Sequence, residues 1–184
     1  MYVKNNDTHR EEKALIQFTK VSGSLDIIKT ACLANQVFGQ HYSQLMPRVQ
    51  VDYFLDNYNS FNVINERIGT GGYGYYHIVN DNRQIGFFAV VPRIGETLEI
   101  EAMGLVKKQR GKGVGKKAVA FIIDKAKEQQ LKTVRIKINK KNEMAVKAFT
   151  KYGFEQIGEE QQKLSGDFFV ENVILTYTIG ENNL

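Results

Sequence analysis

The sequence predicts one α/β domain in which helices cover a mixed, mostly antiparallel sheet. Its 184 residues are a comfortable length for a single hydrophobic core, and 42% hydrophobic with 24% charged residues is typical of a globular chain. Segments with the period of a strand alternate with segments with the period of a helix. No repeat or low-complexity linker divides them, so residues 1–184 are expected to fold together, with residues 1–13 loosely held.

The first elements are a strand and a helical region. Residues 15–21 are predicted to form the strand. Residues 24–46 place apolar side chains at helical spacing and therefore predict one or two helices. Ser24 is a candidate N-cap for this region, and Pro47 is expected to end it.

Three consecutive strands follow, and we expect them to pair antiparallel. Residues 73–79 and 84–91 are rich in aromatic and branched side chains, which favour strands. They flank Asn80-Asp81-Asn82, a composition typical of a hairpin turn. Residues 98–106 return after a second turn at Gly95.

A helix and a strand come next and suggest where a ligand would bind. Small and apolar residues from Gly115 to Ala126 recur at helical spacing, and residues 133–138 alternate as in a strand. This helix lies between two strands, which can therefore run parallel through a right-handed crossover. The loop before the helix then lies at the carboxyl end of a strand, a favoured place for ligands.

The remaining residues predict a short helix and two more strands. The helix covers residues 143–152, with Asn142 as its N-cap and Gly153 as its stop. The strands lie near residues 154–158 and 168–179. The full order is β, α(α), three β, α, β, α, two β, which is a mixed sheet covered by helices.

Glycines crowd the loop before the 115–126 helix. Residues 109–117 contain three glycines within five positions, so their backbone N–H groups can approach an anion closely. Three lysines there (Lys112, Lys116 and Lys117) would each cost up to about 1 kcal/mol at the positive end of a helix dipole, a penalty that a bound pyrophosphate reverses. The loop is not a P-loop, which needs Gly-Lys-Ser/Thr after four spacer residues. It is not the dinucleotide fingerprint either, which needs a glycine where Lys116 stands. A solvated glycine turn remains the alternative.

Two motifs in the right order and separation carry a family resemblance. The first is a strand, then Arg110-x-x-Gly113-x-Gly115, then a helix. The second is an Asn-x-x-Ala helix beginning at Asn142 and ending in Lys151-Tyr152-Gly153-Phe154. Together they resemble the acetyl-CoA signatures of the GNAT N-acetyltransferase superfamily, loosely nearest to its small-molecule and polyamine branch.

The resemblance implies that acetyl-CoA is the acetyl donor. Amides of the glycine loop would bind its pyrophosphate, while the main chain of the preceding strand and Asn142 would hold the pantetheine arm from either side of a splayed gap. The implied binding residues are Leu105, Val106, Gln109, Arg110, Gly111, Lys112, Gly113, Val114, Gly115, Lys116 and Asn142. Asn142 could also serve simply as the helix N-cap.

Direct acetyl transfer to an amine needs a base for the amine and a proton for the departing thiolate. Glu99 and Glu101 share one strand face by period-two alternation, so either could be the base, and we favour Glu101. Many relatives carry the thiolate acid as a tyrosine seven positions after the asparagine, where this chain has Phe149. Tyr152 or water could replace it. The competing interpretation is a salt-bridged strand face and a tyrosine that packs at the helix end.

The acceptor is predicted to be the primary amine of a small molecule, a polyamine for example, or of a peptide. Residues 40–66 and 166–172 resemble the polyamine branch in layout. Four acids in or near these segments could recognise a cationic amine: Asp52, Asp56, Asp167 and Glu171.

Two other functions compete with an acetyltransferase. A nucleic-acid module would explain the basic run of residues 107–117, but the 133–138 strand lacks aromatic side chains on which bases could stack. A non-catalytic acyl-CoA sensor of the same fold would keep Gly113, Gly115 and Asn142 while losing the thiolate acid, as Phe149 suggests.

Composition sets the remaining expectations. The net charge of +5 favours anionic ligands without choosing among them. A single cysteine, Cys32, excludes an internal disulfide, and His9, His41 and His77 are too far apart for a local metal site, so no metal is expected. No signal peptide or long apolar run is visible, so we expect a cytoplasmic protein with neither nucleic acid nor membrane as partner. A homodimer remains open.

Overall fold

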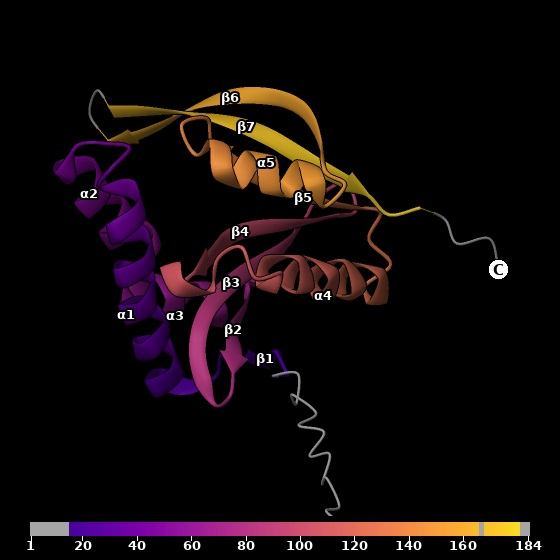
Figure 1. Cartoon of the computed structure of the whole chain (residues 1–184), viewed down its shortest axis with the longest axis horizontal. Coiled ribbons are helices and arrows are strands. Elements are labelled where there is room, and N and C mark those ends of the chain that lie inside the picture. The colour runs from indigo at the N-terminus through magenta and orange to yellow at the C-terminus, as the bar shows by residue number, and fades with distance from the viewer. Residues whose placement is uncertain (1–14, 166–167, 181–184) are drawn as a thin grey trace, which may run out of the picture.

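Figure 1 shows the computed structural model of the chain, which describes residues 15–165 and 168–180. Within these residues, seven strands form one sheet in the order β1-β2-β3-β4-β5-β7-β6. The strands are β1 (Gln17–Lys20), β2 (Gly74–Asn80), β3 (Arg83–Arg93), β4 (Thr97–Leu105), β5 (Thr133–Asn139), β6 (Glu155–Ser165) and β7 (Phe168–Thr178). The helices are α1 (Gly23–Tyr42), α2 (Arg48–Tyr58), α3 (Phe61–Gly69), α4 (Val114–Glu128) and α5 (Glu143–Lys151).

The order of elements confirms the predicted fold class. β4 and β5 run parallel, and the other pairs in the sheet are antiparallel. Asp81 and Asn82 both take positive φ, 49° and 59°, in the two-residue turn between β2 and β3, as the hairpin composition predicted. The expectations for residues 1–13, His9 and Asp167 lie outside the described residues.

The segment between β1 and β2 differs from its prediction. The one or two helices predicted over residues 24–46 are one helix, α1, which ends at Tyr42 and has Ser22 rather than Ser24 as its N-cap. Pro47 is the N-cap residue of the next helix, α2. α2 and α3 have no clear signal in the sequence, because α2 buries just Val51 and Leu55 among its described residues and α3 buries Ile64. Such sparse apolar stripes lack a readable period.

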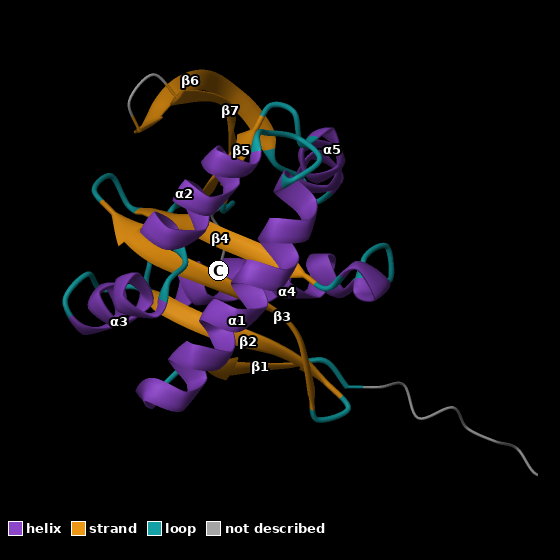
Figure 2. Ribbon diagram, turned by 90° about the vertical axis from the view of Figure 1, so that its left-hand side faces the viewer, coloured by secondary structure: helices purple, strands orange, loops and turns teal. Residues whose placement is uncertain are grey.

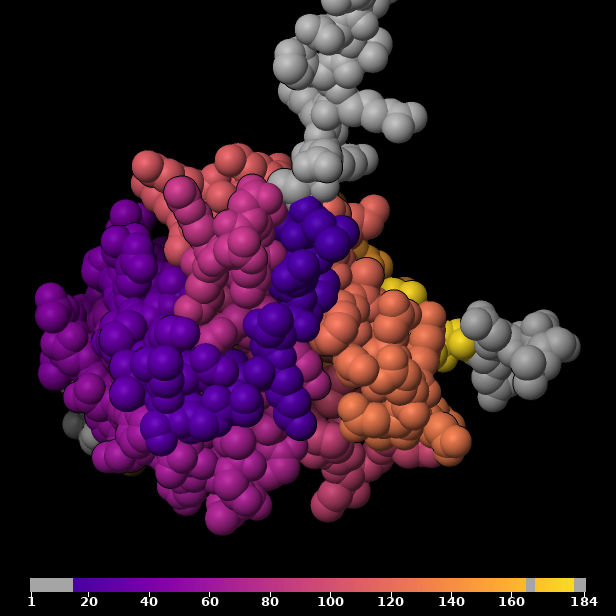
Figure 3. Space-filling view, turned by 90° about the horizontal axis from the view of Figure 1, so that it is seen from below, coloured from indigo at the N-terminus to yellow at the C-terminus, as the bar shows by residue number. Residues whose placement is uncertain are grey.

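Helices lie on both faces of the sheet. Figure 1 shows α1, α2 and α3 on one side and α4 and α5 on the other, and Figure 2 looks onto α1 in front of β2, β3 and β4. The larger core fills the α4 and α5 side, with Ile122 and Leu98 fully buried. At the sheet's edge, Figure 3 shows β1 beside α4, where the Phe18 and Phe121 rings lie 4.8 Å apart. The sheet is thus the central layer, with helices packed against both of its faces.

The parallel pair β4 and β5 separates partway along its length. Its register runs from Thr97 opposite Thr133 to Ile100 opposite Ile136 and then stops, although both strands continue. At that point Ala102 and Ile100 pair with consecutive residues of β3, which leaves Glu101 as the extra residue of a β-bulge. A bulge bends its strand. The predicted splayed gap between β4 and β5 is therefore present, and it opens directly after Ile100, at the bulged Glu101.

Candidate active site

Two cavities meet where β4 and β5 separate. One, of about 580 Å³, lies between the glycine loop, β4 and α5. The other, of about 470 Å³, lies among α1, α2 and strands β3 to β7. The described residues that line both are Phe38, Tyr42, Met103, Asn142, Ala145 and Phe149. A molecule bound in one cavity can thus reach a molecule bound in the other through this junction.

The glycine loop builds a cradle of free amides at one end of the larger cavity. Gly111 and Gly113 take positive φ, 74° and 78°, and Gly113 is the N-cap of α4. Because glycine has no side chain, the cap leaves the first N–H groups of α4 without a capping partner. The earliest backbone bond of the helix runs from Lys117 N–H to Gly113 O, at 3.2 Å. The amides of residues 114–116 therefore remain for an anion, as the pyrophosphate prediction requires.

The predicted binding residues divide into two groups around this cradle. Those that line the cavity are Leu105, Arg110, Gly111, Gly113, Gly115 and Asn142. Those that do not line it are Val106, Gln109, Lys112, Val114 and Lys116. Val114 buries its side chain in the core, and Gln109 donates its N–H to Val106 O at 2.9 Å. A residue of this second group can contact the ligand through its backbone or, for Lys112 and Lys116, through its long side chain.

The main chain at the end of β4 bears on the predicted contacts with the pantetheine arm. Val106 N–H donates to Ile85 O at 2.9 Å, and Val106 O accepts from Gln109. The N–H of Val106 is thus used inside the protein, while its carbonyl oxygen keeps one further lone pair. Backbone groups of an antiparallel ladder alternate in direction, so those of Met103 and Leu105 face the gap instead. The contact of Leu105 and Val106 with the pantetheine arm stays a prediction.

Arg110 has a structural role that the sequence did not reveal. Its Nε donates to Leu105 O at 3.0 Å, which ties the glycine loop back to the end of β4. The guanidinium also lines the larger cavity. It therefore fixes the cradle and places positive charge beside it at the same time.

A matched pair of glycine variants tests the cradle. We expect Gly113→Ala to weaken acetyl-CoA binding about tenfold, because alanine at a left-handed φ costs about 1–2 kcal/mol and the loop would relax away from its binding shape. Gly95→Ala introduces the same strain at φ 84°, in a turn outside both cavities. Calorimetric titration of both variants should show a loss of affinity for Gly113→Ala alone. Equal affinities would contradict the cradle.

The two predicted bases lie in a chain of alternating charges. Glu99 Oε2 lies 2.7 Å from Arg135 Nη2 and 3.5 Å from Arg93. Glu101 lies 3.3 Å from Arg93 Nη2 and 3.5 Å from Arg67 Nη2. Both carboxylates therefore face the smaller cavity on one side of the sheet, as the alternation predicted, and both are ion-paired. Glu99 is the tightly held one, with 7% of its side chain exposed against 21% for Glu101.

Tyr152 lies on the donor side of the site rather than at the junction. Its hydroxyl is 3.0 Å from where a Cβ on Gly115 would lie, at the start of α4. It lines the larger cavity and not the smaller one. Burial raises the pKa of Tyr152, so the hydroxyl keeps its proton at neutral pH. Phe149, buried at the junction, stands at the position where the family resemblance leads one to expect a tyrosine.

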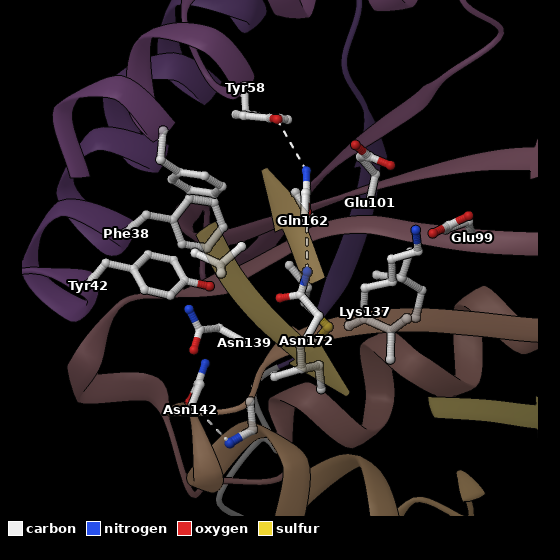
Figure 4. Close-up of a pocket in the computed structure, with 18 of the residues that line it drawn as sticks. Phe38, Tyr42, Tyr58, Glu99, Glu101, Lys137, Asn139, Asn142, Gln162 and Asn172 are labelled. Carbon is white, nitrogen blue, oxygen red and sulfur yellow. Dashed lines mark hydrogen bonds between the residues drawn. The ribbon is translucent and has the colours of Figure 1, made fainter. Parts of the chain in front are cut away.

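The acids expected to recognise a cationic amine do not line the acceptor cavity. Asp52 instead pairs with Arg48 at 2.8 Å on the exposed face of α2, and neither Asp56 nor Glu171 belongs to the wall. The wall has a polar chain that the sequence did not show: Asn172 donates to Gln162 at 3.2 Å, and Gln162 donates to Tyr58 at 3.2 Å. This chain is visible in Figure 4.

The polar chain could not be predicted from the sequence because β6 is longer than its local pattern indicates. β6 was expected near residues 154–158, whereas it continues to Ser165 and carries Gln162 into the wall. The added segment, residues 159–163, is Glu-Glu-Gln-Gln-Lys and has no alternation of apolar and polar residues. Its strand conformation comes from pairing with β7, which no local pattern reports.

Within residues 15–165 and 168–180, no cluster of three or more histidine, cysteine or acidic side chains is placed to ligate a metal ion. In the same part of the chain, no helix combines the length and apolar character that crossing a bilayer demands.

The amide cradle, the splayed strands and the adjoining cavity define an acyl-CoA-binding α/β fold. The model of the Acetyltransferase (GNAT) family matches residues 38–154. The chain therefore belongs to the GNAT acetyltransferase family, as its motifs predicted, and acetyl-CoA is its cosubstrate. No curated protein matches the chain in sequence.

Solved structures share this fold at low sequence identity. The PaiA N-acetyltransferase of Thermoplasma acidophilum, in complex with coenzyme A, is 15% identical, with a TM-score of 0.73 over 90% of this chain and 99% of that one. A GNAT family acetyltransferase of Elizabethkingia anophelis with acetyl-CoA bound is 18% identical, with a TM-score of 0.64 over 89% and 98%. The spermidine/spermine N-acetyltransferase SpeG of Vibrio cholerae is 14% identical, with a TM-score of 0.64 over 89% and 92%.

Proposed function

We propose that the protein transfers the acetyl group of acetyl-CoA directly to a primary amine of a small molecule or peptide bound in the smaller cavity. The observation that carries this proposal is the junction between the two cavities at the splayed strands. The donor cavity ends at a cradle of free amides, and the acceptor cavity contains two carboxylates. Such an arrangement brings two substrates together without a covalent enzyme intermediate.

Glu101 is the proposed general base. Its ion pairs, at 3.3 and 3.5 Å, are longer than the 2.7–2.9 Å of a strong charge-assisted bond. It is also the more exposed of the two glutamates, so an amine or a bridging water can reach it. Glu99, held at 2.7 Å by Arg135, is better suited to fixing that arginine. Free N–H groups of β4 that face the gap would stabilise charge on the acetyl oxygen.

The acceptor cavity favours an amine with one positive charge and an apolar body over a polyamine. Each of its two carboxylates is already matched by arginine, so it has no surplus negative charge for a polycation. Its α1 and α2 side is aromatic, built from Phe38, Tyr42, Phe54 and Tyr58. The rings of Phe54 and Tyr58 stack at 5.4 Å. An aromatic or aliphatic substituent would bury its surface against these rings.

The second candidate function is an acyl-CoA sensor, and Phe149 is the observation that favours it. This side chain, 6% exposed, packs against Phe154 in the core and has no proton to give. A sensor of this fold would bind acetyl-CoA and turn over no amine.

One titration separates the two functions. Acetyl-CoA is added to the protein in a calorimeter, and then a panel of amines is tested for release of CoA: aromatic and aliphatic monoamines, spermidine, and peptides with free amino groups. We expect binding, with turnover fastest on a monoamine. Binding without turnover on any amine would favour the sensor, and preference for spermidine would refute the proposed acceptor class. Absence of binding would overturn both functions.

A further inference from the structure

The place where the cavities meet has one side chain with a proton to donate. Among the described residues that line both cavities, Tyr42 and Asn142 have polar side chains, and the other four are Phe38, Met103, Ala145 and Phe149. An amide does not ionise or give up a proton near neutral pH, whereas a phenol can. The thioester of a donor in the larger cavity must pass this junction to reach an acceptor in the smaller one.

Packing holds the ring of Tyr42 firmly. It contacts Phe38 at 5.9 Å and Phe54 at 5.3 Å between ring centroids, and the His41 ring lies 5.2 Å away. Figure 4 shows the Tyr42 hydroxyl pointing from α1 toward Asn139 and Asn142, across the cavity from Glu101. The aromatic wall thus fixes the ring, and the hydroxyl projects beyond it toward the gap.

Asn142 lies beside that hydroxyl. Its Oδ1 accepts from Ala145 N–H at 3.3 Å as the N-cap of α5, so its amide N–H₂ can serve its two neighbours, the Tyr42 hydroxyl and the His41 ring. Burial raises the pKa of Tyr42, and the bond with Asn142 works in the opposite direction. The phenol therefore holds its proton at neutral pH, as a general acid must.

The other proton-bearing side chains near the junction are placed less well. Tyr152 projects over Gly115 at the start of α4. His41 lines the donor cavity alone, and burial lowers its pKa, so it is neutral at pH 7. Lys137 lines the acceptor cavity and pairs with Glu160 at 2.9 Å. None of these three contributes to both cavities.

We propose that Tyr42, on α1, is the general acid that protonates the departing sulfur of coenzyme A, in place of the acid that Phe149 cannot provide. The inference rests on the proposed acetyl transfer. The amine first gives its extra proton to solvent, and its neutral nitrogen then forms a bond to the acetyl carbon and loses a second proton to Glu101. The C–S bond breaks, its electron pair stays on sulfur, and sulfur takes the proton of Tyr42. Solvent then returns the proton from Glu101 to Tyr42, so the products are an N-acetyl amine and the free thiol.

The test compares two Tyr→Phe variants with the wild type. We expect Tyr42→Phe to lower kcat about 100-fold, toward the lower end of the usual range for general acid catalysis because a thiolate departs readily. Its affinity for acetyl-CoA, measured by calorimetry, should stay within about threefold of wild type. Tyr53→Phe removes a hydroxyl from α2, outside both cavities, and serves as the matched control.

A double variant tests whether Tyr42→Phe loses activity because the junction loses its proton donor. Adding Phe149→Tyr to Tyr42→Phe returns a phenol to the junction, and we expect kcat to recover at least tenfold. A kcat for Tyr42→Phe within about threefold of wild type would overturn the assignment, as would a kcat loss matched by an equal loss of acetyl-CoA affinity. If the wild type itself transfers no acetyl group, the proposed function fails first, and this inference fails with it.

Discussion

Glu101→Gln is expected to lower kcat about 100-fold at neutral pH, because glutamine cannot accept the proton of the amine. The KM for acetyl-CoA should change little, since Glu101 lines the acceptor cavity and not the donor cavity. The loss should appear in steady-state rates of CoA release measured on the best amine of the panel. A variant with wild-type kcat would remove Glu101 from the mechanism.

Glutamine at this position also frees two guanidiniums, so the effect on rate must be separated from an effect on folding. Glu96→Gln makes the same change in the same hairpin, where Glu96 pairs with Lys132 in the exposed turn. Thermal unfolding of both variants reports any difference in stability. A larger kcat loss in Glu99→Gln than in Glu101→Gln would identify Glu99, the more buried glutamate, as the general base.

The largest effect on stability is expected at Gly86, in the middle of β3. A Cβ there would lie 2.5 Å from Gly104 O and 2.6 Å from a methyl of Leu105, both on the neighbouring strand β4. A backbone oxygen cannot swing away as a side chain can. Gly86→Ala should therefore cost about 3 kcal/mol by overpacking, which lowers the melting temperature by roughly 6–12 °C for a chain of this size.

The control for this variant is a strand glycine with room for a methyl group. Gly158→Ala, in β6, would place its Cβ where no atom lies within 4 Å. Its melting temperature should stay within a few degrees of the wild-type value. Equal melting temperatures of the two variants, measured by calorimetry, would contradict overpacking at Gly86. Acetyl-CoA affinity should fall in Gly86→Ala as well, because β4 forms a wall of the donor cavity.

The elements that could be predicted are those whose pattern is local. α4 buries Ala118, Val119, Ile122 and Ile123 at helical spacing, so one stripe of sequence reports its packing. The Asp81-Asn82 turn depends on two residues that tolerate positive φ. The glycine loop is likewise a local signal, because left-handed backbone at Gly111 and Gly113 favours that residue type.

The missed features depend on contacts between distant segments. Tyr42 lies at the end of α1 and reaches Asn142 only because α1 crosses the sheet beside the splay. Gln162 meets Tyr58 across 104 positions of sequence. The hydrogen bond of Val106 to Ile85, which is a bulged residue of β3, is likewise revealed by no one-dimensional pattern. The junction and the acceptor wall could therefore not be derived from the sequence alone.

The four residue pairs that join β4 to β5 divide the sheet into parts with separate tasks. β6 and β7 contribute Gln162, Leu164, Val170 and Asn172 to the acceptor cavity and, among the described residues, nothing to the donor cavity. Selection acting on this terminal hairpin can therefore change which amine is accepted without disturbing the use of acetyl-CoA. Exchanging this hairpin between family members would therefore be a direct route to new acceptors.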